Sequence, residues 1–291
     1  MNVSEAVDQR MSTRAYLDKP VSRETLETLL TKAQRAPSGG NLQPWRTIVL
    51  TGNARQSMIE TAASVLAKSP AGEPTDRAIY PADLWEPHKS RRFGVGEAMY
   101  AALEIPREDK GARLKWFSRN FRFFDAPVAI MIVIDERMGH GQWAHTGMFM
   151  QTLCLLAEEA GLGTCMQECW GILRPTLKEH LGLGETEMLY CGIAMGYPDK
   201  SHPVNQMRSD RADLAAKITH RLTAEKWRVC DFYNTRTFWK DGEVGEEFYQ
   251  VESSNPDPET MFFNFQKVRE CEEKLGPWMR GGDDSLPVST L

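Results

Sequence analysis

The sequence predicts a protein that combines amphipathic helices with strands covered on both faces. Apolar residues recur at the helical spacing of about 3.6 in several segments. Two continuous apolar runs, at 126–134 and 189–197, have the composition of central strands that pack on both sides. The chain has 291 residues, of which 41% are hydrophobic. This length and composition suit one large domain, or one domain plus an extension, with a substantial core.

Helices and strands follow one another along the first 222 residues. Ser22 is a predicted N-cap with Glu24 in the first turn, and Leu26, Leu29 and Ala33 then form one apolar helix face. This helix is expected to end before Pro37. We further expect a short helix at 3–11, a strand at 47–51, helices at 55–68, 142–160 and 173–181, and a helix-ending turn at 161–164 that leads into a strand or loop.

Residues 69–124 differ from the rest of the chain, because five prolines interrupt the pattern and aromatic residues alternate with basic ones. Residues 86–122 hold nine Lys or Arg against five Asp or Glu. Such a segment is typical either of single-stranded nucleic-acid binding or of a helical excursion that covers an active site. The net charge of the whole chain is −5, which favours the excursion.

Composition excludes several classes of protein. The acidic balance, with a pI of about 5.8, gives no global argument for nucleic acid, and no run approaches the roughly 20 apolar residues of a membrane span. The first residues lack the apolar core of a signal peptide. The six cysteines form no Cys-x-x-Cys pair, so we expect no metal site and a reducing, cytoplasmic compartment.

Arg10, Ser12 and Arg14 alternate near the N-terminus. In an extended segment, alternate side chains project to the same side. Two guanidinium groups and a hydroxyl on one side suit an anion. The alternative is a solvated, arginine-rich turn.

Residues 36–45 form a second polar segment, between a predicted helix and a predicted strand. Gly39 and Gly40 allow a close backbone approach, and Asn41 and Gln43 each offer a donor and an acceptor. This inventory suits a planar heterocycle such as a flavin. An elaborate helix–strand loop is the alternative.

The order of several motifs resembles the FMN-dependent nitroreductase family over about residues 5–222. These motifs are Arg-x-Ser-x-Arg at 10–14, Pro-Ser-x-x-Asn-x-Gln-Pro-Trp at 37–45, Gly-Leu-Gly-Thr-Cys at 161–165, Gly-Tyr-Pro-Asp at 196–199, and Pro-Val-Asn at 203–205 followed by arginines. Leu-Trp-Glu-Pro at 84–87 and Arg-Asn-Phe-Arg-Phe-Phe at 119–124 resemble the branch that contains nitrobenzoate-reductase-like enzymes.

The resemblance implies an α+β fold, in which helices wrap a mixed sheet, and a homodimer with two FMN sites at its interface. It implies a cofactor-binding set divided among five segments of the chain. Arg10, Ser12 and Arg14 are implied for the phosphate and the pyrimidine edge, Pro37, Ser38, Gly39 and Asn41 for the partner's contribution, Asn120 for a ring contact, Met166, Gln167, Glu168 and Cys169 for the loop that passes flavin N5, and Arg208 and Arg211 for a closing phosphate contact. Met166 stands where this branch usually has proline.

The implied function is an oxidoreductase that moves two electrons in a ping-pong cycle from NAD(P)H, through FMN, to a nitroaromatic or quinone-like acceptor. Flavin carries this chemistry, so no catalytic side-chain triad is required, and His140 and His145 are interpreted as helix-start residues. A biosynthetic flavin dehydrogenase or reductive dehalogenase on the same scaffold is a second hypothesis. A flavin-binding or storage protein is the third. The expected partners are a second copy of the chain and a small aromatic substrate, without nucleic acid or membrane.

Residues 223–291 match nothing in the family pattern. Their second part, 241–291, holds twelve Asp or Glu against four Lys or Arg, together with several large aromatic residues. Solvated tails rarely carry so many apolar rings. We therefore expect this extension to pack on the dimer near the basic segment 86–122, as a lid over the site or as a strap that adds stability.

Overall fold

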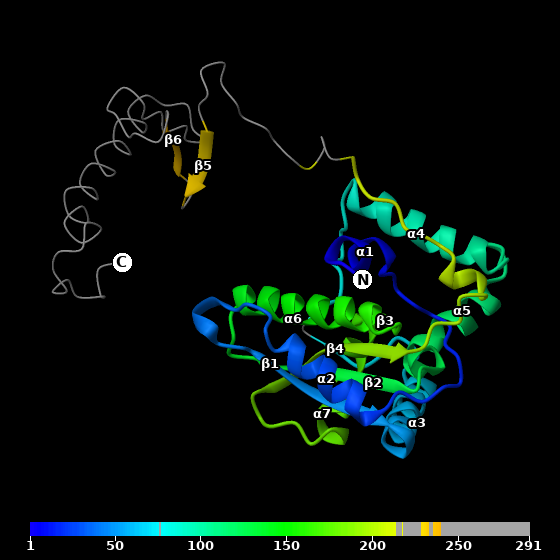
Figure 1. Ribbon diagram of the computed structural model, residues 1–291. Helices are drawn as coiled ribbons and strands as arrows, with labels where there is room; N and C mark the ends of the chain where they lie inside the picture. The colour runs from blue at the N-terminus through cyan, green and yellow to red at the C-terminus, as the bar shows by residue number, and fades with distance from the viewer. Residues whose placement is uncertain (76, 214–216, 218–227, 233–234, 240–291) are drawn as a thin grey trace. The chain divides into compact units, whose positions relative to one another are not determined.

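The computed structural model describes residues 1–75, 77–213, 217, 228–232 and 235–239 (Figure 1). Its contacts divide the chain into two units, Met1–Asp210 and Arg211–Leu291. In the second unit, β5 (Arg228–Phe232) pairs with β6 (Thr235–Trp239) in an antiparallel ladder. The other residues of the extension at 223–291 are outside the described part of the chain. Its predicted packing on the dimer therefore stays a prediction.

A four-stranded sheet forms the centre of the first unit. Its order is β1 (Trp45–Thr51), β2 (Val128–Asp135), β4 (Glu187–Gly196) and β3 (Gly163–Gln167). Both predicted apolar runs, β2 and β4, occupy the two central positions, as their composition indicates. The expected α+β class is confirmed. The expected mixed sheet needs a correction, because all three ladders are antiparallel.

Helices cover both faces of this sheet (Figure 1). The helices α2 (Arg23–Ala33) and α6 (His140–Glu159) pack with one core cluster, which contains Ile130 and Ile132 of β2. The other cluster contains Met131, and α3 (Gly52–Lys68) and α7 (Arg174–His180) belong to it. Alternate β2 side chains therefore point into opposite layers, and each is fully buried.

Local signals set the ends of several elements. The Ser22 hydroxyl accepts a hydrogen bond from the Thr25 N–H, which confirms the predicted N-cap of α2. Strand β1 starts at Trp45, two residues earlier than expected. The Trp45 indole stacks on Phe149 at 5.0 Å and donates to Gln34 Oε1 at 3.0 Å. Trp45 is thus a core residue of β1 and does not belong to the exposed loop before it.

The segment 69–124 contains α4 (His88–Ala102) and α5 (Lys110–Ser118), followed by the 3-10 segment η2 (Arg119–Asp125). These two helices stand outside the sheet layers (Figure 1). No residue of α4 is buried, whereas Trp116 of α5 packs with Ala15 and Val204. The remaining elements are α1 (Val3–Gln9) and the 3-10 segments η1 (Gly39–Asn41), η3 (Glu168–Leu173) and η4 (Pro203–Asn205).

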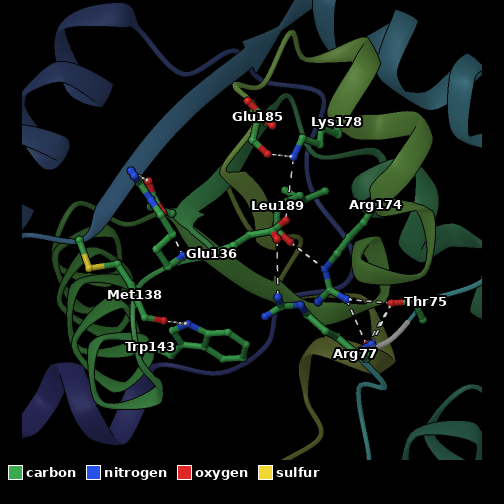
Figure 2. Close-up of polar contacts among 11 residues, drawn as sticks. Thr75, Arg77, Glu136, Met138, Trp143, Arg174, Lys178, Glu185 and Leu189 are labelled. Atoms are coloured by element: carbon green, nitrogen blue, oxygen red, sulfur yellow. Dashed lines mark hydrogen bonds and ion pairs between the residues drawn. The ribbon is translucent and has the colours of Figure 1, made fainter.

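A network of polar contacts attaches the chain segment before α4 to the core (Figure 2). Arg174 of α7 donates to the carbonyl oxygens of Leu189 at 3.0 Å and Arg77 at 3.1 Å. The Arg77 guanidinium lies 3.6 Å from the Glu136 carboxylate and 5.4 Å from the ring centroid of Trp143. The chain before α4 is therefore tied to the end of β2, to α6 and to α7.

Candidate functional site

Residues 10–16 run as an extended segment beside the end of β3. The Thr13 N–H donates to the Thr164 carbonyl at 2.9 Å, and Ser12 forms an isolated parallel bridge with Thr164. Thr13 is 2% exposed and Ala15 is 5% exposed. Ser12 and Arg14 are half-buried, so burial alternates from Ser12 to Ala15, whereas Arg10 and Met11 are both half-buried.

Close packing holds this segment in place. A Cβ atom at Gly163 would lie only 2.3 Å from Thr13 Oγ1, so a larger residue at this position of β3 would push the segment away. The Tyr16 hydroxyl donates to the Thr13 carbonyl at 2.9 Å. Burial raises the pKa of the Tyr16 hydroxyl well above its ordinary value, which keeps it protonated and able to donate.

The Arg14 guanidinium lies over its own segment. Its Nη1 donates to the Ser12 carbonyl at 3.2 Å, and its Cζ is 6.0 Å from the ring centroid of Phe124. Arg208 reaches the same part of the chain, because its Nη1 donates to the carbonyl of Gln9 at 2.8 Å. Arg208 therefore lies beside the residue that precedes Arg10.

Three cations act on the carboxylate of Glu158 in α6. Burial raises the pKa of the Glu158 carboxyl, while the positive charges of Arg208, Lys200 and Arg10 act in the opposite direction. Arg10 and Arg208 thus act on the same carboxylate. Guanidinium groups that outnumber a nearby carboxylate are the donor set that a phosphate monoester requires, so this part of the structure fits the phosphate end of FMN.

The structure brings together two other predicted residues, Asn120 and Gln167. Gln167 is 2% exposed, and its Nε2 donates to the Asn120 carbonyl at 2.8 Å. Its Oε1 accepts from the indole N–H of Trp170 at 3.5 Å, and Asn120 Nδ2 donates to the carbonyl of Phe117 at 2.9 Å. Both side chains therefore join η2 to the end of β3, a structural task that the sequence did not indicate.

The neighbours of Gln167 differ in exposure. Met166 is half-buried against the core, and Glu168 is exposed. Burial raises the pKa of the Cys169 thiol well above its ordinary value. Cys169 is therefore a neutral thiol at physiological pH, not a reactive thiolate.

The loop from Pro37 to Gln43 has a backbone that suits an exposed binding surface. Gly40, Asn41 and Gln43 all have positive φ, at 58°, 54° and 47°. Ser38 Oγ accepts from the Gln43 N–H at 2.9 Å, and the Gln43 side chain donates to Asn41. The Gly39 N–H points to His145 Nδ1 at 3.4 Å, which attaches the loop to the first turns of α6.

The Pro37–Asn41 loop and the arginine segment thus form two separate groups within one chain. The loop touches α6 at His145, whereas Arg10 and Arg208 act on Glu158 near the other end of that helix. Thirteen helical residues span about 20 Å. The structure does not bring Pro37, Ser38, Gly39 and Asn41 together with the Arg10–Arg14 segment of the same chain.

Two residues with a part in this arrangement were not identified from the sequence. His145 was expected only as a helix-start residue, yet it supports the Gly39 backbone. Asn205, noted only as part of Pro-Val-Asn, accepts the Arg14 N–H at 2.9 Å. Arg14 is 191 residues away in the chain, and no local pattern could have indicated this contact. The predicted role of Arg211 stays a prediction, because this residue belongs to the second unit.

Other kinds of site were also sought. Among the residues that the structure describes, no group of three or more His, Cys, Asp or Glu residues could hold a metal ion. Within the same residues, no helix is long and apolar enough to cross a membrane.

The fold is α+β, and Arg208 binds the carbonyl before Arg10, where an extended segment meets the central sheet. The model of the nitroreductase family matches residues 7–197. The chain belongs to the nitroreductase family. Its helices, sheet and motifs agree with the resemblance drawn from the sequence.

Several relatives are known by function. Nitrobenzene nitroreductase of Ectopseudomonas oleovorans is 35% identical over 73% of this chain and 93% of its own length. 4-Nitrobenzoate reductase of Pseudomonas putida is 33% identical over 74% of this chain and 92% of its own length. The crystal structure of the FMN- and NADPH-dependent nitroreductase NfnB from Sphigopyxis sp. strain HMH is 42% identical, with a TM-score of 0.74 over 76% of this chain and 99% of that chain. NfnB from Mycobacterium smegmatis, solved with NADPH, is 27% identical, with a TM-score of 0.70.

Proposed function

We propose that this chain is an FMN-dependent oxidoreductase that uses NAD(P)H to reduce nitroaromatic or quinone-like compounds. The observation that carries the proposal is the gathering of Arg10, Arg14 and Arg208 beside one extended segment, in a fold shared with FMN- and NADPH-dependent nitroreductases. When bound, FMN supplies the two-electron exchange between the nicotinamide nucleotide and the acceptor.

The side chains of this site have binding and orienting roles. Arg10 and Arg208 hold the phosphate through charge-assisted hydrogen bonds. Arg14, which lies between Ser12 and Phe124, supports negative charge on the pyrimidine side of the ring. One such charge at about 4 Å is worth at most about 4 kcal/mol at an effective dielectric constant near 20.

A second copy of the chain completes the site in this proposal. The loop at Pro37–Asn41 is about 20 Å along α6 from the Arg10–Arg14 segment of its own chain. In a two-fold dimer, the same loop of the partner can meet that segment, and each chain then contributes to both sites.

Spectroscopy of the purified protein tests the proposal. We expect a yellow protein with one FMN per chain, whose absorption is bleached by NADPH or NADH without oxygen and restored by 4-nitrobenzoate or nitrobenzene. A stable FMN complex that neither nucleotide bleaches would support a storage role. A colourless protein that cannot be reconstituted with FMN would overturn the proposal.

A further inference from the structure

The side-chain amide of Asn205 joins two segments that are far apart in sequence. Its Oδ1 accepts from the Arg14 N–H at 2.9 Å. Its Nδ2 donates to the carbonyls of Ala15 and Asp199, each at 2.8 Å. Both N–H groups of the amide and one lone pair of its oxygen are therefore in use.

The chemistry of these partners requires asparagine. A backbone N–H can only donate and two backbone carbonyls can only accept, so the orientation of the amide is fixed by its neighbours. An aspartate here would place negative oxygens against the carbonyls of Ala15 and Asp199. Alanine would remove all three hydrogen bonds.

The buried residue before Asn205 holds the amide in position. Val204, the preceding residue, is fully buried with Ala15 and Trp116. The Val204 N–H donates to His202 Nδ1 at 3.3 Å, which caps the short segment η4. The Asn205 side chain thus extends from a fixed point toward Arg14.

The main chain on both sides of Arg14 is paired with strands or with residues that follow them. Thr13 donates to Thr164 at 2.9 Å, the Asp199 N–H donates to the Ala15 carbonyl at 3.0 Å, and Leu17 donates to the Tyr197 carbonyl at 2.9 Å. Between the first two of these pairings, the Arg14 N–H has a side chain as its acceptor. The two neighbours of Arg14 are thus held by backbone hydrogen bonds, and Asn205 holds the peptide N–H of Arg14 itself.

We propose that Asn205 is a positioning residue that sets where the Arg14 guanidinium lies against the flavin. This inference rests on the proposed function. Asn205 acts through the Arg14 main chain and does not itself touch the cofactor. Replacing Asn205 should therefore change the midpoint potential of the bound flavin only through its effect on Arg14.

Hydrogen–deuterium exchange of the full chain tests the first step without reference to the cofactor. Asn205→Ala should accelerate exchange in a peptide that covers residues 12–16, on the order of tenfold. Gln206→Ala is the matched control, because the neighbouring exposed amide contacts only the Ser201 carbonyl, at 3.4 Å. Unchanged exchange at 12–16 in Asn205→Ala would overturn the inference. If this variant does not fold, Asn205→Ser serves in its place.

The midpoint potential of the FMN-loaded protein tests the second step. Asn205→Ala should lower the potential in the same direction as Arg14→Gln and slow reduction by NADPH on the order of tenfold. In a protein that already carries Arg14→Gln, Asn205→Ala should not lower the potential further, because the guanidinium that Asn205 positions is absent. Gln206→Ala should leave the potential at the wild-type value.

The outcomes separate two kinds of failure. Equal effects of Asn205→Ala with and without Arg14 would show general stabilisation and overturn the inference, while the proposed function stands. If the wild-type protein binds no FMN, the proposed function fails, and the exchange experiment still decides whether Asn205 holds Arg14.

Discussion

Arginine geometry decides the function at the scale of single residues. Arg208 donates to the carbonyl of Gln9 at 2.8 Å, next to Arg10, and the charges of both arginines act on the partly buried carboxylate of Glu158. Their value to the protein lies in charge-assisted hydrogen bonds, which are worth about 1.5–3 kcal/mol each.

Arg10→Ala should therefore weaken FMN binding about tenfold to a hundredfold. Titration of the protein without cofactor, followed by flavin fluorescence, measures the change. Arg23→Ala is the control, because Arg23 forms an exposed ion pair with Glu27 on α2, away from the site. Equal affinity in the wild-type protein and Arg10→Ala would remove Arg10 from the phosphate site.

The buried thiols make the protein sensitive to alkaline pH. Burial raises the pKa of Cys154 to about 11, whereas a thiol in the unfolded chain titrates near 8.5. Between these values the folded state keeps a proton that the unfolded state loses. The free energy of unfolding should thus fall as pH rises from about 8.5 toward 11, by up to about 1.4 kcal/mol per pH unit.

Cys154→Ala should flatten this dependence. Urea unfolding of the two proteins at several pH values from 8 to 10.5 gives the comparison, and all other groups titrate equally in both. The variant should be less stable at pH 8, because it leaves a small cavity, and should lose less stability by pH 10.5. Parallel curves would show that the Cys154 thiol does not titrate as described.

At the scale of elements, composition predicts some parts of the fold better than others. Strand β2 could be located because burial on both faces leaves a continuous apolar run. The start of β1 could not, because Trp45 joins the strand through contacts with Gln34 and Phe149. The limits of α4 could not be predicted either, because a helix without a buried residue has no apolar face that shows the helical period.

The same distinction applies to the site. The alternation of Arg10, Ser12 and Arg14 is local, so the sequence predicts the side to which they point. Gln167 is implied for the loop that passes flavin N5, and this stays a prediction; the sequence did not indicate that its side chain is buried against Asn120 and Trp170. Which polar residues face the inside depends on segments that meet only in the folded chain.

One arginine of α5 makes several contacts with α4 and with the segment between the two helices. Arg113 forms a bidentate pair with Glu97, with N–O distances of 2.6 and 3.1 Å, and its Nε donates to the Pro106 carbonyl at 3.1 Å. The guanidinium also lies 4.3 Å from the ring centroid of Tyr100. A lysine keeps the charge but cannot reproduce the planar fork.

Arg113→Lys should therefore loosen α4 and α5 while the sheet stays intact. Limited proteolysis should cut within 88–118 several times faster than in the wild-type protein, and far-ultraviolet circular dichroism should change little. Arg23→Lys, at an exposed pair on α2, is the matched control. Unchanged cleavage would mean that other contacts hold α4 and α5 in place.

At the scale of the whole molecule, the proposal divides each FMN site between two chains. The Pro37–Asn41 loop lies at the start of α6, and the arginine segment lies near its end. About 20 Å of helix separates His145, to which the loop is attached, from Glu158, on which Arg10 and Arg208 act. In a two-fold dimer, the loop of each chain can serve the segment of the other.

Mixed dimers test this arrangement directly. Arg10→Ala disables the phosphate segment, and Gly40→Val should disable the loop, because a β-branched residue is strained at a φ of 58°. Each variant alone should form dimers that bind FMN weakly. A heterodimer, isolated with two different tags, should regain about one tight FMN site per dimer, since one site then combines a wild-type segment with a wild-type loop. No recovery in a verified heterodimer would show that each loop serves its own chain, and an FMN-loaded monomer in sedimentation would exclude a shared site altogether.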